Sequence, residues 1–327
     1  MRATGIGRAL AVAAALLAVS GALAQELAQE FPQRPVRLIT GSPGGTSDFS
    51  ARYIAQKLSE RWRQQVVVDN RPAVGGIVAA EIVAKANPDG HTLIVSGISV
   101  HATAQHLIKR LPFDPLRDFA PVSNLTHSGI VIVVVPALPA QNLREFIAYA
   151  KARTGGVNYA SSVAGSSSHL AGELFNQLTG AGLVHIPYKG AGFSLSALMT
   201  AEVQSAFLAT TTTSTQVKAG RLRALALLSE RRYPGMPEVP TAAEQGYAGL
   251  ESYVWFGLFA PARTPPALVA RINRDVSAIL RHPETLQAML TQGAEPTPSS
   301  PEAFAAFVKS ESVKWGAVIR AAKIELQ

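Results

Sequence analysis

The chain has 327 residues, no cysteine and a formal net charge of +8. A chain of this length can bury a sizeable core without disulfides. With no cysteine it can form neither a disulfide nor a lipid-anchor thioether after a signal peptide. The basic residues are scattered rather than gathered with aromatic side chains, which argues against a nucleic-acid-binding surface. The positive balance favours encounter with acidic solutes.

The first two dozen residues are typical of a targeting segment. Arg2 and Arg8 precede an unbroken apolar run over 9–19. This run is too short to span a bilayer comfortably. Ala22-Leu23-Ala24 supplies an A-x-A cleavage pattern. An amphipathic N-terminal helix is the alternative, but the segment has no polar face. We therefore expect cleavage before Gln25 and, in a Gram-negative cell, export to the periplasm.

The first part of the mature chain alternates apolar runs with helical patterns. Strands are predicted at 36–40, 66–69 and 92–96, with helices between them at 47–62 and 76–86. This alternation implies a parallel sheet with helices on its faces. Ligands of such sheets bind beyond the carboxyl ends of the strands, where the loops 41–48 and 96–99 fall.

A glycine-rich loop follows the first predicted strand and opens a helix. Its residues are Gly41-Ser42-Pro43-Gly44-Gly45-Thr46-Ser47-Asp48. Such a corner directs free backbone N–H groups and the positive end of a helix dipole at one spot, which suits an anion. A tight turn without a ligand is the alternative.

A second cycle begins with the β-branched run 130–135, which we interpret as a crossing into a second domain. A strand at 157–160 leads into the hydroxyl-rich loop 161–168 and a helix over 170–178. Two such corners facing each other would clamp an anionic solute. The loop 188–192 could form a third wall. The threonines at 210–213 could face the ligand or cap the next helix.

Later strands are predicted at 183–187, 203–208, 224–228 and 253–259, the last as a return crossing. Asn142 to Glu145 and Thr241 to Glu244 have the spacing of capping boxes. Helices are expected from Thr264-Pro265 to Leu280 and after Ser299.

Few side chains suggest chemistry of their own. His101 and His106 are expected at the surface or as caps, and His169 as a helix-start residue rather than a metal ligand. A serine of the 161–168 loop with His169 would make a hydrolase, but no third orienting group is evident. We therefore predict no catalytic residue, no metal site and no cofactor. Asp48 is expected to cap the first helical turn, or else to pair with an amino group of the solute.

Several sequence blocks occur in an order and spacing that are specific together. They are Pro43-Gly44-Gly45-Thr46-Ser47-Asp48, Val66-Val67-Val68-Asp69-Asn70-Arg71-Pro72 with Gly75-Gly76, Pro88-Asp89-Gly90-His91-Thr92-Leu93, Phe113-Asp114-Pro115 with Asp118-Phe119-Ala120-Pro121-Val122, Gly165-Ser166-Ser167-Ser168-His169-Leu170-Ala171-Gly172-Glu173, Pro187-Tyr188-Lys189-Gly190-Ala191-Gly192, Pro240-Thr241 with Glu244 and Gly246, Trp255-Phe256-Gly257-Leu258-Phe259-Ala260-Pro261, and Trp315-Gly316. Over nearly all of its mature length, the chain resembles the Bug-type periplasmic receptors, the substrate-binding components of tripartite tricarboxylate transporters.

The resemblance implies an α/β, two-domain periplasmic binding protein of the Venus-flytrap, type II-like kind. Each domain would be a mostly parallel sheet flanked by helices. The expected divisions are a signal peptide at 1–24, the first part of domain 1 at 25–127, domain 2 at 128–252 and the second part of domain 1 at 253–327.

The resemblance also implies that a small carboxylated solute (an organic acid, amino acid or amide) binds in the cleft, mostly through backbone amides, hydroxyls and bridging waters rather than through Arg or Lys. With the loops above, it gives the candidate ligand-binding residues Pro43, Gly44, Gly45, Thr46, Asp48, Ser96, Gly97, Ser161, Ser162, Gly165, Ser166, Ser167, Tyr188, Gly190, Gly192 and Thr211. The expected partner of this monomer is a membrane permease, with a sensor protein as the alternative and no nucleic acid.

Some positions depart from the family pattern on the second-domain side of the cleft. They are Val163-Ala164, Ala197-Leu198, Thr200-Ala201, Gln204, Ala209 and Thr210. These departures leave the identity of the solute open.

Overall fold

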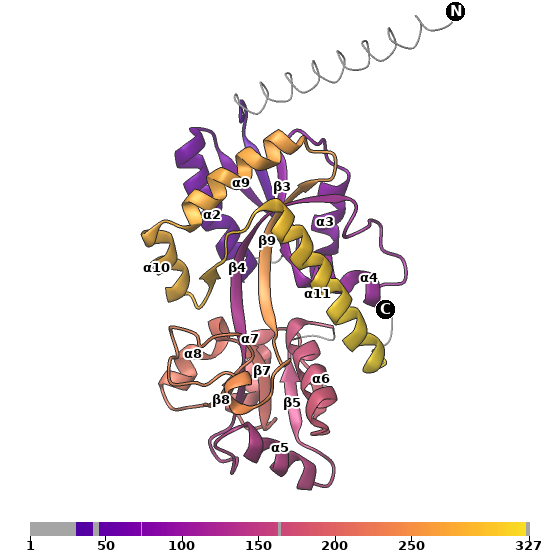
Figure 1. The fold of residues 1–327 in the computed structure, drawn as a ribbon, viewed down its shortest axis with the longest axis vertical. Helices are drawn as coiled ribbons and strands as arrows, with labels where there is room; N and C mark the ends of the chain where they lie inside the picture. The colour runs from indigo at the N-terminus through magenta and orange to yellow at the C-terminus, as the bar shows by residue number, and fades with distance from the viewer. Residues whose placement is uncertain (1–30, 42–45, 73, 163–164, 325–327) are drawn as a thin grey trace, which may run out of the picture.

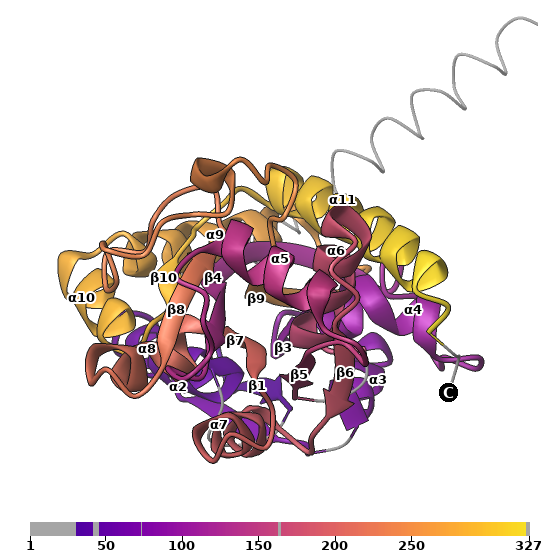
Figure 2. The same ribbon diagram turned by 90° about the horizontal axis from the view of Figure 1, so that it is seen from below.

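The computed structural model describes residues 31–41, 46–72, 74–162 and 165–324. These residues form two lobes stacked along the long axis of the molecule, each with strands at its centre and helices around them (Figures 1 and 2). Among the described residues, no helix combines the length and the apolar character needed to cross a membrane.

The first lobe is built around a sheet with the strand order β2-β1-β3-β9-β4. Its strands are β1 (Val36–Thr40), β2 (Val66–Asn70), β3 (Thr92–Gly97), the first half of β4 (Phe119–Val134), β9 (Tyr253–Pro261) and the short β10 (Glu295–Pro296). Its helices are α2 (Thr46–Trp62), α3 (Ile77–Ala84), α4 (Ala104–Leu107), α9 (Pro266–Leu280), α10 (Pro283–Thr291) and α11 (Pro301–Ala321). Short helical turns at Val74–Gly76 and Ser99–Thr103 follow β2 and β3.

The second lobe continues from β4 in the order β4-β7-β5-β6, with β8 also paired to β4. Its strands are β5 (Asn158–Ser161), β6 (Val184–Pro187), β7 (Ser205–Ala209) and β8 (Arg223–Leu227). Its helices are α5 (Leu143–Ala152), α6 (Ser167–Thr179), α7 (Ala191–Met199) and α8 (Thr210–Lys218), with a 3₁₀ turn at Ala243–Gln245.

Two strands carry the chain between the lobes (Figure 1). The first half of β4 pairs with β9, from Phe119 opposite Pro261 to Gly129 opposite Tyr253. From Ile130 onward β4 pairs instead with β7 and β8. One 16-residue strand therefore belongs to both sheets, and it starts well before the β-branched run that predicted a crossing.

The βαβ units give parallel pairing, as the alternation of strands and helices predicts. β1 pairs in parallel with β2 and β3, and β5 pairs in parallel with β6 and β7. The antiparallel pairs all involve β4 or β9. The first-lobe sheet thus joins a parallel unit to both crossing strands, β9 and β4, whereas the second-lobe sheet joins its parallel unit to β4, with β8 paired to the same strand.

Local sequence signals place most elements accurately. Strands predicted to begin at 36, 66, 92 and 253 begin there, and the others begin within two residues of the prediction. The capping boxes are confirmed. Asn142 accepts the Glu145 N–H at 3.0 Å, and Thr241 and Glu244 accept each other's N–H at 3.1 and 2.7 Å. The second box opens only the 3₁₀ turn.

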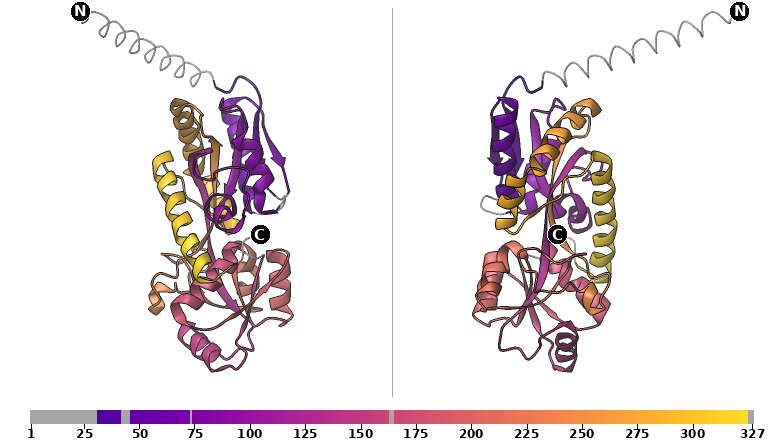
Figure 3. Two further views of the ribbon diagram at one scale, coloured as in Figure 1. Left: turned by 90° about the vertical axis from the view of Figure 1, so that its right-hand side faces the viewer. Right: turned by 60° about the vertical axis from the view of Figure 1, so that its left-hand side comes forward.

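Helix α11 runs down one side of the first lobe toward the second (Figure 3). Its Trp315 and Ile319 share one buried apolar cluster with Leu170 and Leu174 of α6. Near the middle of α11, the buried Glu311 accepts the indole N–H groups of Trp255 and Trp315 at 3.0 and 2.8 Å. Glu311 thereby connects α11 to the crossing strand β9.

The Glu311→Ala substitution leaves two buried indole N–H groups without their acceptor. We expect a loss of about 2–4 kcal/mol in the free energy of unfolding, because each unpaired buried donor keeps its desolvation penalty. Chemical denaturation measures this loss, and Glu238→Ala at an exposed position is the matched control. Equal stability of the two variants would contradict a bridging role for Glu311.

Candidate functional site

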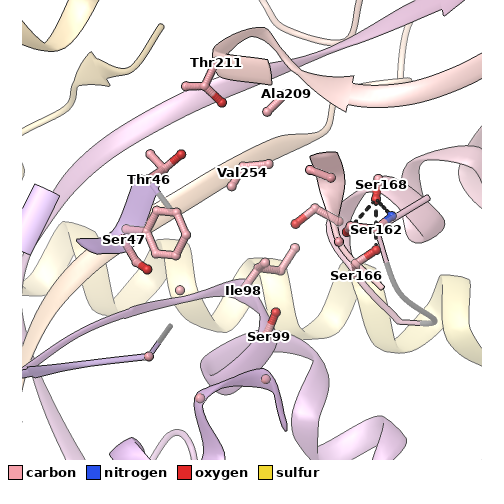
Figure 4. Close-up of a pocket in the computed structure, with 18 of the residues that line it drawn as sticks. Thr46, Ser47, Ile98, Ser99, Ser162, Ser166, Ser168, Ala209, Thr211 and Val254 are labelled. Atoms are coloured by element: carbon pink, nitrogen blue, oxygen red, sulfur yellow. Dashed lines mark hydrogen bonds between the residues drawn. The ribbon is translucent and has the colours of Figure 1, made fainter. Parts of the chain in front are cut away.

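A cavity of about 810 Å³ lies between the lobes and is lined by residues of both. In Figure 4 the hydroxyl groups of Thr46 and Thr211 lie toward one side of this cavity, and those of Ser162 and Ser168 toward the other. Val254, from the crossing strand β9, lies between them. The cavity therefore has polar ends and an apolar middle.

The topology brings four helix N-termini to this cavity. α2, α6, α7 and α8 each follow a strand by a short turn, and residues of the first turn or cap of every one line the cavity. Parallel strands end at the same edge of a sheet, so α6, α7 and α8 begin at one edge of the second-lobe sheet and α2 begins at the corresponding edge of the first-lobe sheet. The first-turn N–H groups have no intrahelical acceptor and carry the positive end of the helix dipole. Their convergence makes the cavity attractive to an anion.

A network of serine hydroxyls fixes the start of α6. Ser168 Oγ accepts the Ser162 N–H at 2.9 Å and lies 3.1 Å from Ser162 Oγ and 3.0 Å from Ser166 Oγ (Figure 4). Ser166 also caps the helix by accepting the His169 N–H at 3.3 Å. These bonds hold the hydroxyls in place at the cavity wall before any solute arrives.

A pair of neutral imidazoles supports the serine network from behind. His169 stacks on His185 with 3.7 Å between ring centroids, and its Nδ1 accepts the Gly165 N–H at 2.8 Å. Ser161 Oγ lies 2.6 Å from His185 Nε2. Burial, with a smaller contribution from the neighbouring ring, lowers the pKa of His169 to about 3, and burial lowers that of His185 to about 4. Both rings are therefore uncharged at neutral pH.

The first lobe positions a serine in the same way. Ser96 lines the cavity, and its Oγ lies 2.6 Å from Nε2 of the fully buried His101. The other ring nitrogen, Nδ1, lies 3.1 Å from the Pro115 carbonyl, so Nδ1 carries the proton and Nε2 accepts from Ser96. The ring stacks on Phe259 at 3.7 Å, and burial lowers its pKa to about 4. The expectation of a surface or capping role is wrong for His101.

The electrostatic character of the cavity comes mainly from its backbone. Among the described residues that line it, Lys189 is the sole charged side chain and no carboxylate is present. The described part of the chain also contains no cluster of metal-ligating side chains. An anion entering the cavity thus meets helix N-termini, hydroxyls and one ammonium group.

Comparison with known proteins agrees with this geometry. The model of the "Tripartite tricarboxylate transporter family receptor" matches residues 50–324. The chain belongs to this receptor family. The protein BugT of Bordetella pertussis is 36% identical over 315 residues, which cover 96% of this chain and 97% of BugT. The resemblance inferred from the sequence blocks is confirmed.

Two solved structures of relatives contain solutes. R. palustris Rpa4515 with adipate has a TM-score of 0.80 and 34% identity, covering 91% of this chain and all of that one. MatC from Rhodopseudomonas palustris with bound malate has a TM-score of 0.76 and 32% identity, covering 88% of this chain and all of that one. The receptor therefore has the two-lobed Venus-flytrap fold of periplasmic binding proteins, as predicted. It is a solute-binding receptor and not an enzyme.

The structure brings most of the candidate residues to the cavity. Those that line it are Thr46, Ser96, Gly97, Ser162, Ser166, Ser167, Gly190, Gly192 and Thr211. Ser161 and Gly165 instead contact the histidine pair behind the wall. Tyr188 directs its hydroxyl to Glu202 at 2.9 Å, and it is not among the lining residues. Pro43, Gly44 and Gly45 lie outside the described residues.

Asp48 lies in the first turn of α2, is buried, and does not line the cavity. Its carboxylate accepts from Asn70 Nδ2 at 2.8 Å and from Arg52 Nε at 3.0 Å. These contacts tie α2 to the end of β2. The expectation of a bond to an amino group of the solute has no support from this position.

Sequence reasoning missed part of the wall. Ile98, Ser99, Ser168 and Thr212 lie in the predicted loops but were not among the candidate residues. The lining residues outside every predicted loop include Phe49, Gly75, Gly76, Val254, Phe256 and Gln292. Gly75-Gly76 was recognisable as a second glycine turn after a strand. The sequence around Val254 and Phe256 did not indicate that they line the cavity. Which face of a crossing strand does so depends on how the two lobes pack against it.

Gly192 offers a direct test of the cavity wall. A Cβ added there meets no atom within 4 Å, so Gly192→Leu places a side chain in open space at the wall without a clash. We expect loss of carboxylate binding in calorimetry. The melting temperature of the empty protein should change by no more than about 4 °C, since Leu favours the helix over Gly. Ser196→Leu, on an exposed position of the same helix, is the control and should bind normally. Normal binding by Gly192→Leu would place the solute elsewhere.

The buried neutral His101 makes stability depend on pH. Its pKa is about 4 in the folded protein and near 6.5 when unfolded, so the unfolded state takes up the proton first as pH falls. We expect stability to be complete above pH 6.5, with about 3 kcal/mol lost through this group as pH falls toward 4. Denaturation midpoints across this range should fall less steeply for His101→Gln than for the wild type. Equal slopes for His101→Gln and the wild type would contradict a lowered pKa of His101 in the folded protein.

Proposed function

We propose that this receptor captures a small carboxylate-bearing metabolite between its lobes and delivers it to a permease of the tripartite tricarboxylate type. In this proposal the chain is exported with the signal peptide cleaved before Gln25, and it acts as a monomer without a cofactor. The observation that carries the proposal is the convergence of four helix N-termini on a cavity whose described wall has no carboxylate.

Hydrogen bonds from the wall are sufficient for a useful affinity. Charge-assisted hydrogen bonds to a carboxylate contribute about 1.5–3 kcal/mol each. Three such bonds in a closed cavity approach the roughly 8 kcal/mol of micromolar binding, before ordering costs. The N–H groups at the start of α6, α7 and α8, together with the Thr211 hydroxyl, provide more donors than the three that this estimate requires.

Two observations favour an organic acid over an amino acid. The relatives Rpa4515 and MatC have structures with adipate and malate. Asp48, the one carboxylate near the first-lobe corner that could meet an amino group, is engaged by Arg52 and Asn70 away from the lining residues. An ammonium group on the solute would therefore lack a counter-charge in the described wall.

Closure would turn the lobes about the crossing strands β4 and β9, with domain 2 spanning 128–252. Contacts behind the cavity already join the lobes. Thr210 Oγ1 donates to the Gly293 carbonyl at 3.1 Å, and Tyr233 donates to the Leu290 carbonyl at 2.8 Å. These bonds lie on the α10–β10 side, so motion at the outer ends of α3 and α7 would admit and release the solute.

A thermal-shift screen of purified residues 25–327 tests the proposal. We expect a saturable rise in melting temperature with dicarboxylates such as adipate or malate, following mass action, and no rise with amino acids. Mass spectrometry of the denatured protein checks whether a solute was retained during purification. An empty protein that responds to no carboxylate would overturn the proposal. Loss of uptake of the identified solute on deletion of the receptor would support delivery to a permease, whereas retained uptake would favour a sensor role.

A further inference from the structure

The cavity wall contains one charged side chain in addition to its backbone and hydroxyl donors. Lys189 lies in the turn between β6 and α7 and is the sole charged side chain among the described lining residues. It is exposed, and within the described part of the chain no hydrogen bond or ion pair engages it. Exposed lysines often lack a partner, but this one lines the cavity. Lys189 has a free ammonium group at the edge of a site that attracts anions.

The strand order places the turn that carries Lys189. From the crossing strand β4 outward, the second-lobe strands are β7, β5 and β6. The turns after them bring Thr211, the serine network and Lys189 to the cavity in that order. Lys189 therefore belongs to the end of the cavity farthest from the hinge.

The backbone beneath Lys189 is well anchored. The Tyr188 N–H donates to the Ser161 carbonyl at 3.0 Å, and Ser194 Oγ donates to the same carbonyl at 2.8 Å. The neighbouring Tyr188 side chain is held by Glu202. This turn therefore keeps its place on β5, and the long lysine side chain alone can adjust to a solute.

We propose that Lys189 determines the charge specificity of the receptor by pairing with a second anionic group of the solute. The inference rests on the proposed function, since it concerns the same cavity. The N–H groups and hydroxyls nearer the hinge bind one carboxylate, the apolar strip at Val254 and Ile98 accommodates the hydrocarbon part, and Lys189 meets the far end. N–H and O–H groups can donate to an ester or amide oxygen as well as to a carboxylate, whereas an ammonium group distinguishes a charged end from a neutral one.

Matched pairs of solutes isolate this contact. Succinate, glutarate, adipate and suberate are each compared with their own monomethyl ester, which keeps the length and removes one charge. Calorimetry gives the ratio of the two dissociation constants for the wild type, Lys189→Gln, Lys189→Arg and Lys218→Gln. Lys218 lies at the far end of α8, is exposed and does not line the cavity, so its variant has the same net charge as Lys189→Gln.

For the best-bound length, we expect the wild type to prefer the dicarboxylate by about tenfold, in line with one partly exposed charge pair. The ratio should fall close to one in Lys189→Gln, recover in Lys189→Arg and stay at the wild-type value in Lys218→Gln. Raising the ionic strength should reduce the wild-type ratio and leave that of Lys189→Gln unchanged.

An unchanged ratio in Lys189→Gln would overturn the inference and leave the proposed function standing, because carboxylates would still bind. A wild-type ratio near one would overturn it as well. Absence of binding by every diacid and every ester would overturn both the inference and the proposed function. An equal loss in Lys218→Gln would show a general effect of net charge rather than a contact at Lys189, and would also overturn the inference.

Discussion

The gathering of helix N-termini from two sheets around one cavity is the constraint on which this structure depends. The first turns of α2, α6, α7 and α8 meet around a single cavity, and none of these donors has an acceptor within its own helix. A carboxylate of the protein placed there would satisfy them permanently and close the site. Ser166 accepts one of them, the His169 N–H, and the small residues of the turns allow an acceptor from outside to approach the others.

The crossing strands join the two halves of the cavity wall. β4 pairs with β9 in the first-lobe sheet and with β7 in the second, so the proposed closure would turn the lobes about this shared strand. Glu311 reinforces the first half by accepting from Trp255 on β9 and Trp315 on α11. The bond from Thr210 to Gly293 holds the hinge end of the cavity. Rotation therefore changes the outer end of the cavity most, where the β6–α7 turn lies.

Local patterns sufficed to predict the strands, the turns and much of the cavity wall, because strand ends and helix starts are encoded within a few residues. The failures all involve partners distant in sequence. His101 follows a helix-like pattern, yet its burial depends on Phe259 and Pro115. Tyr188 belongs to a conspicuous motif, but Glu202 draws its hydroxyl away from the site. No periodicity within a segment can reveal which neighbour another segment will supply.

Histidines, rather than carboxylates, hold two serine hydroxyls beside the cavity, and the need to attract an anion explains this choice. Ser96 bonds to the buried His101 and Ser161 to the half-buried His185, and the low pKa of each ring keeps it neutral. A carboxylate at either position would accept the same hydroxyl hydrogen, but it would add a negative charge beside an anion-binding cavity. At an effective dielectric of about 20, two like charges a few ångströms apart repel by several kcal/mol, roughly what two hydrogen bonds to a solute contribute. A neutral imidazole orients the hydroxyl without repelling the anion. The site can therefore hold its hydroxyls in fixed positions and still bind an anionic solute.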